Sequence, residues 1–163
     1  MTGFDPERLL RALVDHEVEF CVIGAIAASL QGSPVATFDL DVMPQRDLGN
    51  ADRLAAALNA LGARRVDGTA AELDGGDFLG WQSQHFETDA GPLDVVPNAA
   101  AIGGFEAVAT IGLKLGDLSI RVLALDEVIA SKESLGRPKD IAALPVLYAA
   151  RDARQRKRES PSG

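Results

Sequence analysis

Two aspartates separated by a single residue are the side chains of this sequence with the clearest chemical potential. Asp39 and Asp41 flank Leu40 in the segment 36–42, whose composition predicts a β-strand. In a strand, residues i and i+2 project from the same face, so both carboxylates lie together. Like charges this close repel one another unless a cation lies between them, and hard divalent cations prefer oxygen ligands. The pair therefore predicts a metal site.

A third aspartate, Asp94, lies in the apolar segment 93–96, directly after the turn signal Gly91-Pro92. We expect that turn to bring this strand beside the first pair. Three carboxylates from neighbouring strands can hold two Mg²⁺ ions, an arrangement that supports in-line displacement at phosphorus. Taken singly, each aspartate has an ordinary alternative as an edge residue, an Asx turn or an ion-pair partner. The three together favour the metal site.

A small-residue turn precedes the acidic pair. Gly24-Ala25 follows the apolar strand that contains Cys21, and a helical stretch, 26–30, comes next. Such a turn leaves backbone N–H groups unpaired at the start of a helix, where they can bind phosphate. A phosphate-bearing substrate is thus consistent with the predicted metal site.

Composition indicates one globular domain. The 163 residues carry a formal net charge of −8, and 47% of them are hydrophobic. We expect a single domain over residues 1–158 and a disordered tail at 159–163. No segment has the length and apolarity of a membrane span, and the first residues lack the order of a signal peptide. Cys21 is the sole cysteine, so no internal disulfide is expected and the cytoplasm is the expected compartment.

Charge is unevenly distributed along the chain. Residues 1–136 are strongly acidic, whereas residues 137–163 contain seven Lys or Arg against three Asp or Glu. An acidic body argues against broad nonspecific binding to nucleic acid, because lysine and arginine supply most affinity for phosphate backbones. The basic stretch 151–158 has two interpretations: a contact for RNA phosphates, or a solvated helix end whose cations match the helix dipole.

The apolar pattern predicts an α/β (α+β) fold. Asp5 and Asn50 are expected as helix N-caps, and Pro145 is expected to start or kink the last helix. The expected helices are 6–16, 26–31, 50–61, 126–135, 138–144 and 145–154. The expected extended segments are 19–23, 36–42, 64–66, 85–88 and 93–96, with a hairpin of 109–114 and 119–123 across Gly116-Asp117.

The order of these features resembles a known signature. Gly24-Ala25, thirteen further residues, Asp39-Leu40-Asp41 and the later Asp94 are similar to the minimal pattern of the nucleotidyltransferase superfamily, which includes DNA polymerase beta and the CCA-adding enzymes. The resemblance extends over roughly residues 20–145. It implies a mixed sheet flanked by helices, with a short C-terminal helical segment.

A narrower resemblance concerns segments 22–41 and 129–141, which are similar to the AbiEii/MenT-type toxins of bacterial toxin–antitoxin systems. Those proteins often have glycine, histidine and arginine where this sequence has Ala25, Gln31 and Val35. The glycine-to-alanine change is mild because the expected phosphate contact is made by backbone N–H groups. Without an arginine at position 35, other cations of the C-terminal run must neutralise the triphosphate.

The resemblance implies roles for individual residues. Asp39, Asp41 and Asp94 would hold Mg²⁺ or Mn²⁺, with Asp94 also favouring deprotonation of the attacking hydroxyl. Lys132 would stabilise the charge that develops on pyrophosphate, and Asp140 would orient Lys132 or Arg137. The residues expected to contact the nucleotide are Gly24, Ala25, Ser29, Thr37, Arg137, Lys139 and Asp140.

Three further features have ordinary interpretations. His16 is expected to face solvent at a helix end, and His85 has no cysteine or second histidine at the spacing of a zinc site. The aromatic loop 75–81 could stack a base, although such a loop is more often a turn with an anchoring hydrophobe.

The function implied by the resemblance is transfer of NMP from an NTP to the 3′ end of tRNA, which would block translation. The expected partners are the NTP, the tRNA 3′ end and a cognate antitoxin protein. The alternative acceptors are a protein hydroxyl and a small molecule such as an antibiotic. A non-enzymatic binding or antitoxin module is disfavoured, because all three carboxylates are present.

Overall fold

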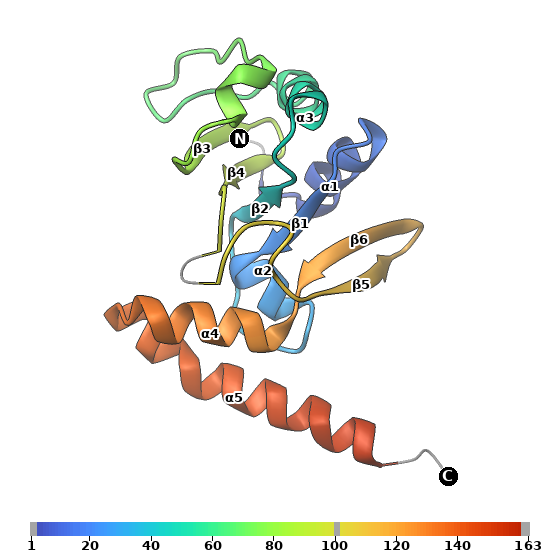
Figure 1. Ribbon diagram of the computed structural model, residues 1–163, viewed down its shortest axis with the longest axis vertical. Coiled ribbons are helices and arrows are strands. Elements are labelled where there is room, and N and C mark those ends of the chain that lie inside the picture. Colours follow the sequence, from blue (N-terminus) through green and yellow to red (C-terminus); the bar gives the residue numbers. More distant parts are fainter. Residues whose placement is uncertain (1–2, 100–101, 161–163) are drawn as a thin grey trace.

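A computed structural model describes residues 3–99 and 102–160 of the protein. Its centre is a six-stranded mixed sheet with the strand order β3-β4-β2-β1-β6-β5 (Figure 1). The strands are β1 (Phe20–Ile23), β2 (Leu40–Pro44), β3 (Gln84–Thr88), β4 (Gly91–Val95), β5 (Thr110–Leu115) and β6 (Leu118–Leu123). The pairs β1–β6 and β2–β4 are parallel, and the other three pairs are antiparallel. The predicted α/β fold with a mixed sheet is confirmed.

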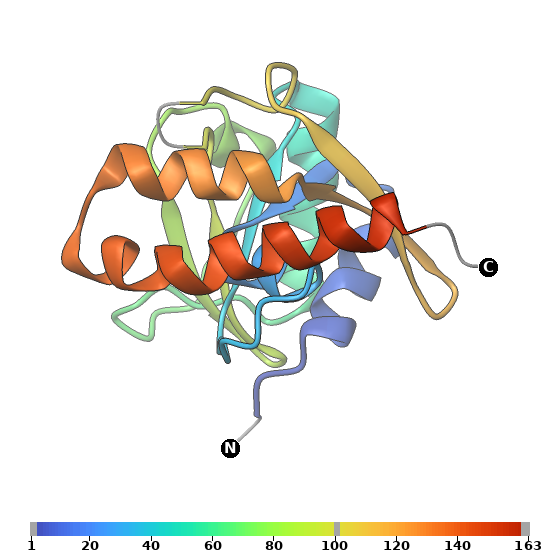
Figure 2. The same cartoon turned by 90° about the horizontal axis from the view of Figure 1, so that it is seen from below.

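Helices lie around this sheet. They are α1 (Pro6–Asp15), α2 (Gly24–Ser29), α3 (Leu48–Ala60), α4 (Leu125–Leu135) and α5 (Pro138–Glu159), with a short 3₁₀ helix, η1, at Gly75–Phe78. Figure 2 shows α4 and α5 side by side and antiparallel, in front of the sheet. α4 also packs against α2. All four residues of β1 are buried, as expected for a central strand covered on both faces. Among the described residues, no helix is long and apolar enough to cross a membrane.

Local sequence explains the start of α1. The Asp5 side chain accepts a hydrogen bond from the Arg8 backbone N–H at 3.0 Å, and Pro6 occupies the first helical position. The apolar face of the helix, Leu9, Leu10 and Leu13, is buried. The prediction of Asp5 as N-cap is confirmed.

The start of α3 differs from the prediction. Asp47, not Asn50, is the N-cap, and its carboxylate accepts a hydrogen bond from the Asn50 backbone N–H at 2.8 Å. The Asn50 side chain is buried and instead bonds the backbone of Glu19 and Gln45. Asp and Asn are similarly good caps. The bonds of Asn50 to Glu19, just before β1, and to Gln45, just after β2, therefore decided between the two.

The C-terminal helices also differ. α5 is one helix of 22 residues that continues through Pro145, so neither the expected break nor the end near Arg154 is found. The C-terminal helical segment is long rather than short. A proline removes the hydrogen bond to the carbonyl four residues earlier, here that of Ile141. Ile141 is 57% exposed, so this turn of the helix faces solvent. Glu159 belongs to the helix and not to a disordered tail, and residues 161–163 lie outside the described residues.

Three extended or helical boundaries need smaller corrections. β2 begins at Leu40, so Asp39 lies immediately before the strand and not within it. The segment 64–66 forms only isolated bridges at Arg64, and α2 ends at Ser29 rather than near Gln31. The predicted hairpin is confirmed as β5 and β6, with Leu115 paired to Leu118 across Gly116-Asp117.

The buried side chain of Gln31 joins three elements, α2, β6 and α4. Its side-chain N–H₂ group donates to the backbone oxygens of Ala27 and Leu123, and its carbonyl oxygen accepts from the Leu125 backbone N–H, all at 2.8–2.9 Å. The residue is only 2% exposed. These bonds fix the C-terminal end of β6 and the start of α4 against α2.

We expect Gln31→Leu to lower the free energy of unfolding by about 2–4 kcal/mol, because it leaves buried backbone groups unpaired. For a chain of this size, the melting temperature should fall by about 5–10 °C. Thermal unfolding followed by circular dichroism measures this change. The control is Gln155→Leu on the exposed side of α5, which should shift the melting temperature by less than about 2 °C. Equal shifts for the two variants would contradict the structural role of Gln31.

Candidate active site

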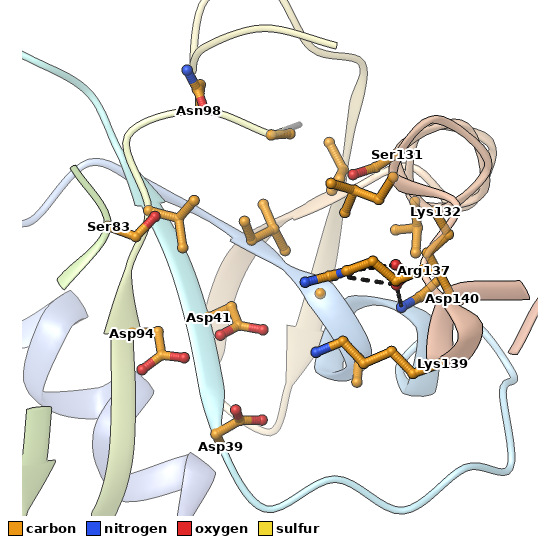
Figure 3. A pocket seen from close by; sticks show the side chains of 18 of the residues that line it. Asp39, Asp41, Ser83, Asp94, Asn98, Ser131, Lys132, Arg137, Lys139 and Asp140 are labelled. Carbon is orange, nitrogen blue, oxygen red and sulfur yellow. Dashed lines mark hydrogen bonds and ion pairs between the residues drawn. The ribbon is translucent and has the colours of Figure 1, made fainter. Parts of the chain in front are cut away.

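The acidic residues and the C-terminal cations predicted from the sequence line one cavity of about 550 Å³. It lies where the ends of β1, β2 and β4 face α4 and the start of α5. Figure 3 shows Asp39, Asp41 and Asp94 along one side and side chains of the α4–α5 region on the other. The cationic residues that line it are Lys132, Arg137 and Lys139. An anionic substrate with bound cations would match both sides.

Strand register brings the three carboxylates together. β2 and β4 are parallel neighbours in which Asp41 is paired with Asp94, and Asp39 precedes Asp41 by two residues. One oxygen of each carboxylate lies within 4.8 Å of the others. The Thr37 hydroxyl donates to Asp39 Oδ1 at 3.1 Å and so helps to hold that carboxylate outside the strand. Thr37 therefore contacts the triad.

The surroundings of Asp41 show that the three carboxylates suit a bound cation. Burial, followed by the neighbouring carboxylates Asp39 and Asp94, raises the pKa of Asp41 to about 7, while His85 opposes the shift. The folded protein thus binds a proton where a free aspartate would be ionised. Oxygen ligands are the type that Mg²⁺ and Mn²⁺ prefer, and a bound cation would remove the repulsion. The residues present fit a divalent metal.

Gly24 allows the close approach of Asp41 to the end of β1. Its φ angle is +69°, and a Cβ at this position would overlap Asp41 Oδ2. The left-handed backbone and the lack of space both require glycine. Ala25 lines the cavity beside it. The expectation that these two residues offer backbone amides to phosphates stays a prediction.

A buried carboxylate organises the cationic side. Asp140 has no exposed surface and accepts hydrogen bonds from Arg137 Nε at 2.6 Å and Nη2 at 3.2 Å, and Lys132 Nζ lies 3.5 Å from its Oδ1. The guanidinium of Arg137 holds the pKa of Asp140 below its usual range. Asp140 thus contacts both cations that the sequence associated with it (Figure 3). One anion aligns two cations on the same side of the cavity.

Two of the predicted nucleotide contacts, Thr37 and Ser29, are not among the residues that line the cavity. Thr37 bonds Asp39 instead, and Ser29 lies elsewhere. It lines a different hollow, together with Pro6, Leu115 and Gly116. Ser29 is the last residue of α2, whereas the cavity meets the first turn of that helix at Gly24 and Ala25. The length of the helix separates these two places.

Other cavity residues were not predicted. Ser83, His85, Asn98 and Ser131 all line it. His85 was discounted because it has no zinc-like spacing, yet its Nδ1 lies 2.8 Å from Asp94 Oδ1. The short turn between β3 and β4 was the signal that could have found this pair, because it aligns residue 85 with residue 94.

The aromatic side chains of loop 75–81 pack against other parts of the protein. Phe78 is buried and packs against Phe86, with ring centroids 6.1 Å apart. Trp81 is exposed, and the Arg46 guanidinium lies 3.5 Å from its ring centroid. Trp81 is not among the residues that line the cavity. The loop therefore contains the expected anchoring hydrophobe, and its aromatic surface is already stacked on arginine.

No family model matches the sequence, and no curated protein matches it significantly. Several solved structures share its fold. The lincomycin-bound lincosamide antibiotic adenylyltransferase LnuA aligns with a TM-score of 0.61 and 13% identity over 91% of this chain and 99% of its own. The antibiotic-resistance factor ANT(2'')-Ia aligns with a TM-score of 0.58 and 14% identity over 94% and 91%. A Thermotoga maritima protein described as a nucleotidyltransferase aligns with a TM-score of 0.53 and 15% identity over 98% of both chains. The chain therefore has a nucleotidyltransferase fold along nearly its whole length.

Proposed function

We propose that this protein is a nucleotidyltransferase that uses Mg²⁺ or Mn²⁺ to transfer NMP from an NTP to a hydroxyl group. The observation that carries the proposal is the cavity in which three clustered carboxylates face three cationic side chains. A triphosphate with bound metal ions is complementary to both sides. The nucleotidyltransferase fold supports the same class of reaction.

Asp39, Asp41 and Asp94 would hold the metal, which when bound would neutralise phosphate charge and favour ionisation of the acceptor hydroxyl. The acceptor oxygen forms a bond to the α-phosphorus, and the bond from that phosphorus to the bridging oxygen of the β-phosphate breaks. Pyrophosphate leaves, and Asp94 accepts the hydroxyl proton.

The cationic side acts on the leaving group. Lys132 and Arg137, aligned by Asp140, would stabilise the charge that develops on pyrophosphate, and Lys139 would add to nucleotide binding. Because these side chains are held before the substrate arrives, less reorganisation is needed during the reaction. Gly24 and Ala25 would contribute backbone N–H groups to the phosphates.

The acceptor we favour is the 3′ end of RNA, with tRNA first. α5 starts at the cavity with Arg137 as its N-cap, and its C-terminal turns contain Arg154, Arg156 and Arg158. At about 1.5 Å per residue, those arginines lie about 25–30 Å along the helix from the cavity. An RNA end in the cavity could therefore place its stem phosphates near the far end of α5. A tRNA modified at its 3′ end could not be aminoacylated, so translation would stop. The protein would then act as a toxin, and a cognate antitoxin would be its partner.

A small hydroxyl compound is the second candidate acceptor. Two structures that share the fold are antibiotic-related, and LnuA was solved with lincomycin bound. The alignment spans 99% of LnuA, so a protein of this fold and size binds a small hydroxyl compound in that structure. The net charge of −8 also favours a small or cationic acceptor over a long polyanion.

The test supplies purified protein with each α-labelled NTP, Mg²⁺ and one of two acceptor sets. One set is total bacterial RNA, and the other is a panel of hydroxyl-bearing antibiotics that includes lincomycin. Asp39→Asn is the inactive control. A second variant replaces Arg154, Arg156 and Arg158 by serine, far from the metal ligands.

Label on a tRNA-sized band, lost in Asp39→Asn and reduced in the triple-serine variant, supports the tRNA acceptor. Label on a small molecule, unchanged in the triple-serine variant, establishes the second candidate. If no NTP releases pyrophosphate with any acceptor, the proposed nucleotidyl transfer is wrong.

A further inference from the structure

His85 lies beside the predicted metal ligands without belonging to them. Its Nδ1 is 2.8 Å from Asp94 Oδ1, and both residues line the cavity. The His85 side chain is 62% exposed, whereas that of Asp94 is 18% exposed. Asp94 is therefore the enclosed partner, and His85 forms the solvent side of the contact.

The sheet imposes this contact. In the antiparallel pair β3–β4, His85 is directly opposite Asp94. Their neighbours Phe86 and Leu93 are opposite each other and buried, so the two polar side chains share the other face. Directly opposed residues on one face have Cβ atoms about 5 Å apart, which suits a hydrogen bond between side chains.

The direction of the bond follows from the groups. An ionised carboxylate only accepts hydrogen bonds, so Nδ1 carries the hydrogen and donates it to Oδ1. The second oxygen, Oδ2, is then available to a cation. Hydrogen bonds to a ligating carboxylate fix its orientation, and their loss commonly weakens metal binding or activity by 10–100-fold.

We propose that His85 is a positioning residue that orients Asp94 for metal binding and for acceptance of the hydroxyl proton. This inference rests on the proposed function, and it adds a residue that the carboxylate pattern does not include. His85 acts through Asp94 and touches neither the nucleotide nor the reacting atoms in this role.

Calorimetric titration of the nucleotide-free protein with MnCl₂ tests the proposal, together with kcat and KM for NMP transfer. His85→Ala should raise the Kd for Mn²⁺ about tenfold or more and lower kcat by a similar factor, with little change in the KM for the NTP. His85→Asn should restore Mn²⁺ binding to within about threefold of wild type, because asparagine Nδ2 occupies the place of histidine Nδ1 and donates the same bond. The control is His16→Ala, whose ring contacts the Ala12 carbonyl on α1 and which should leave both measurements unchanged.

The outcomes separate this inference from the proposed function. If the wild type binds Mn²⁺ and transfers NMP, Asp41→Asn does neither, and His85→Ala matches the wild type, the positioning role is wrong while the enzyme assignment stands. Equal loss in His85→Ala and His85→Asn would also overturn it, because the hydrogen bond would not be the cause. If the wild type does not bind Mn²⁺, the metal site itself is wrong.

Discussion

Asp41→Asn should abolish nucleotidyl transfer and at the same time make the metal-free protein more stable at pH 8. The activity should fall by about 10³-fold or more, because the variant lacks the central carboxylate of the triad. The stability should rise because the folded protein no longer has to keep a buried negative charge beside Asp39 and Asp94. A loss of activity combined with a gain in stability is expected for a functional residue that destabilises the folded protein.

The sign of the pH effect follows from the raised pKa of Asp41. The ordinary value is 3.8, and the value in the folded protein is about 7. Below about pH 4 the group is protonated in both states, so it has no effect. Between pH 4 and pH 7 the unfolded chain loses this proton while the folded chain keeps it, so stability falls as the pH rises, and the loss is complete above about pH 7. The difference between Asp41→Asn and wild type should therefore grow from pH 4 to pH 8.

Melting temperatures at pH 4 and pH 8, with and without MgCl₂ or MnCl₂, measure this prediction. At pH 8 without metal, the variant should melt on the order of 5–10 °C above wild type. Metal should raise the melting temperature of wild type and not that of the variant. Asp15→Asn, at the exposed end of α1, should follow wild type in every condition. A metal-induced shift of equal size in Asp41→Asn would show that the triad is not the metal site.

Asp140→Ala should produce the second-largest effect. Without this buried anion, Arg137 loses both of its charge-assisted hydrogen bonds and Lys132 loses its nearest counterion. The two cations would then spread into solvent, so we expect kcat to fall by about 10²-fold or more. Removing one partner of a buried ion pair costs about 3–5 kcal/mol. Because the Arg137 side chain is 50% exposed and can reach water, a loss of about 2–3 kcal/mol is expected.

Urea unfolding and steady-state kinetics measure these changes. Arg137→Lys keeps the positive charge but loses the paired hydrogen bonds. Its kcat should therefore lie between those of wild type and Asp140→Ala. Asp152→Asn, an exposed carboxylate on the same helix, is the matched control and should change neither quantity. A wild-type kcat in Asp140→Ala would show that alignment of Lys132 and Arg137 does not contribute to the reaction.

The contribution of Asp140 to the stability of the fold should depend on pH, because Arg137 lowers its pKa. This stabilisation is present above pH 4 and is lost as the pH falls through the lowered pKa.

Local patterns were sufficient where neighbouring residues decide the structure. Asp5 before Pro6 defined the start of α1, and Gly116-Asp117 defined the β5–β6 hairpin, because caps and two-residue turns depend on a few adjacent groups. Local patterns were insufficient where groups distant in the sequence compete for the same side chain. Asn50 was predicted as a cap, but its amide bonds to Glu19 and Gln45 gave it a buried role.

The sequence by itself determined the α/β class and predicted that Asp39 and Asp41 lie together, because they are only two residues apart. Asp39 lies just before β2, where the Thr37 hydroxyl bonds it. Only the tertiary structure decided that Asp94 joins them through the parallel β2–β4 register and that His85 bonds Asp94 from the next strand. The turn into β4 predicted proximity, but register depends on contacts along whole strands. The packing of α4 against α5 likewise placed Lys132, Arg137 and Lys139 opposite the three carboxylates. No local sequence pattern predicts this arrangement, because the two groups are far apart in the sequence.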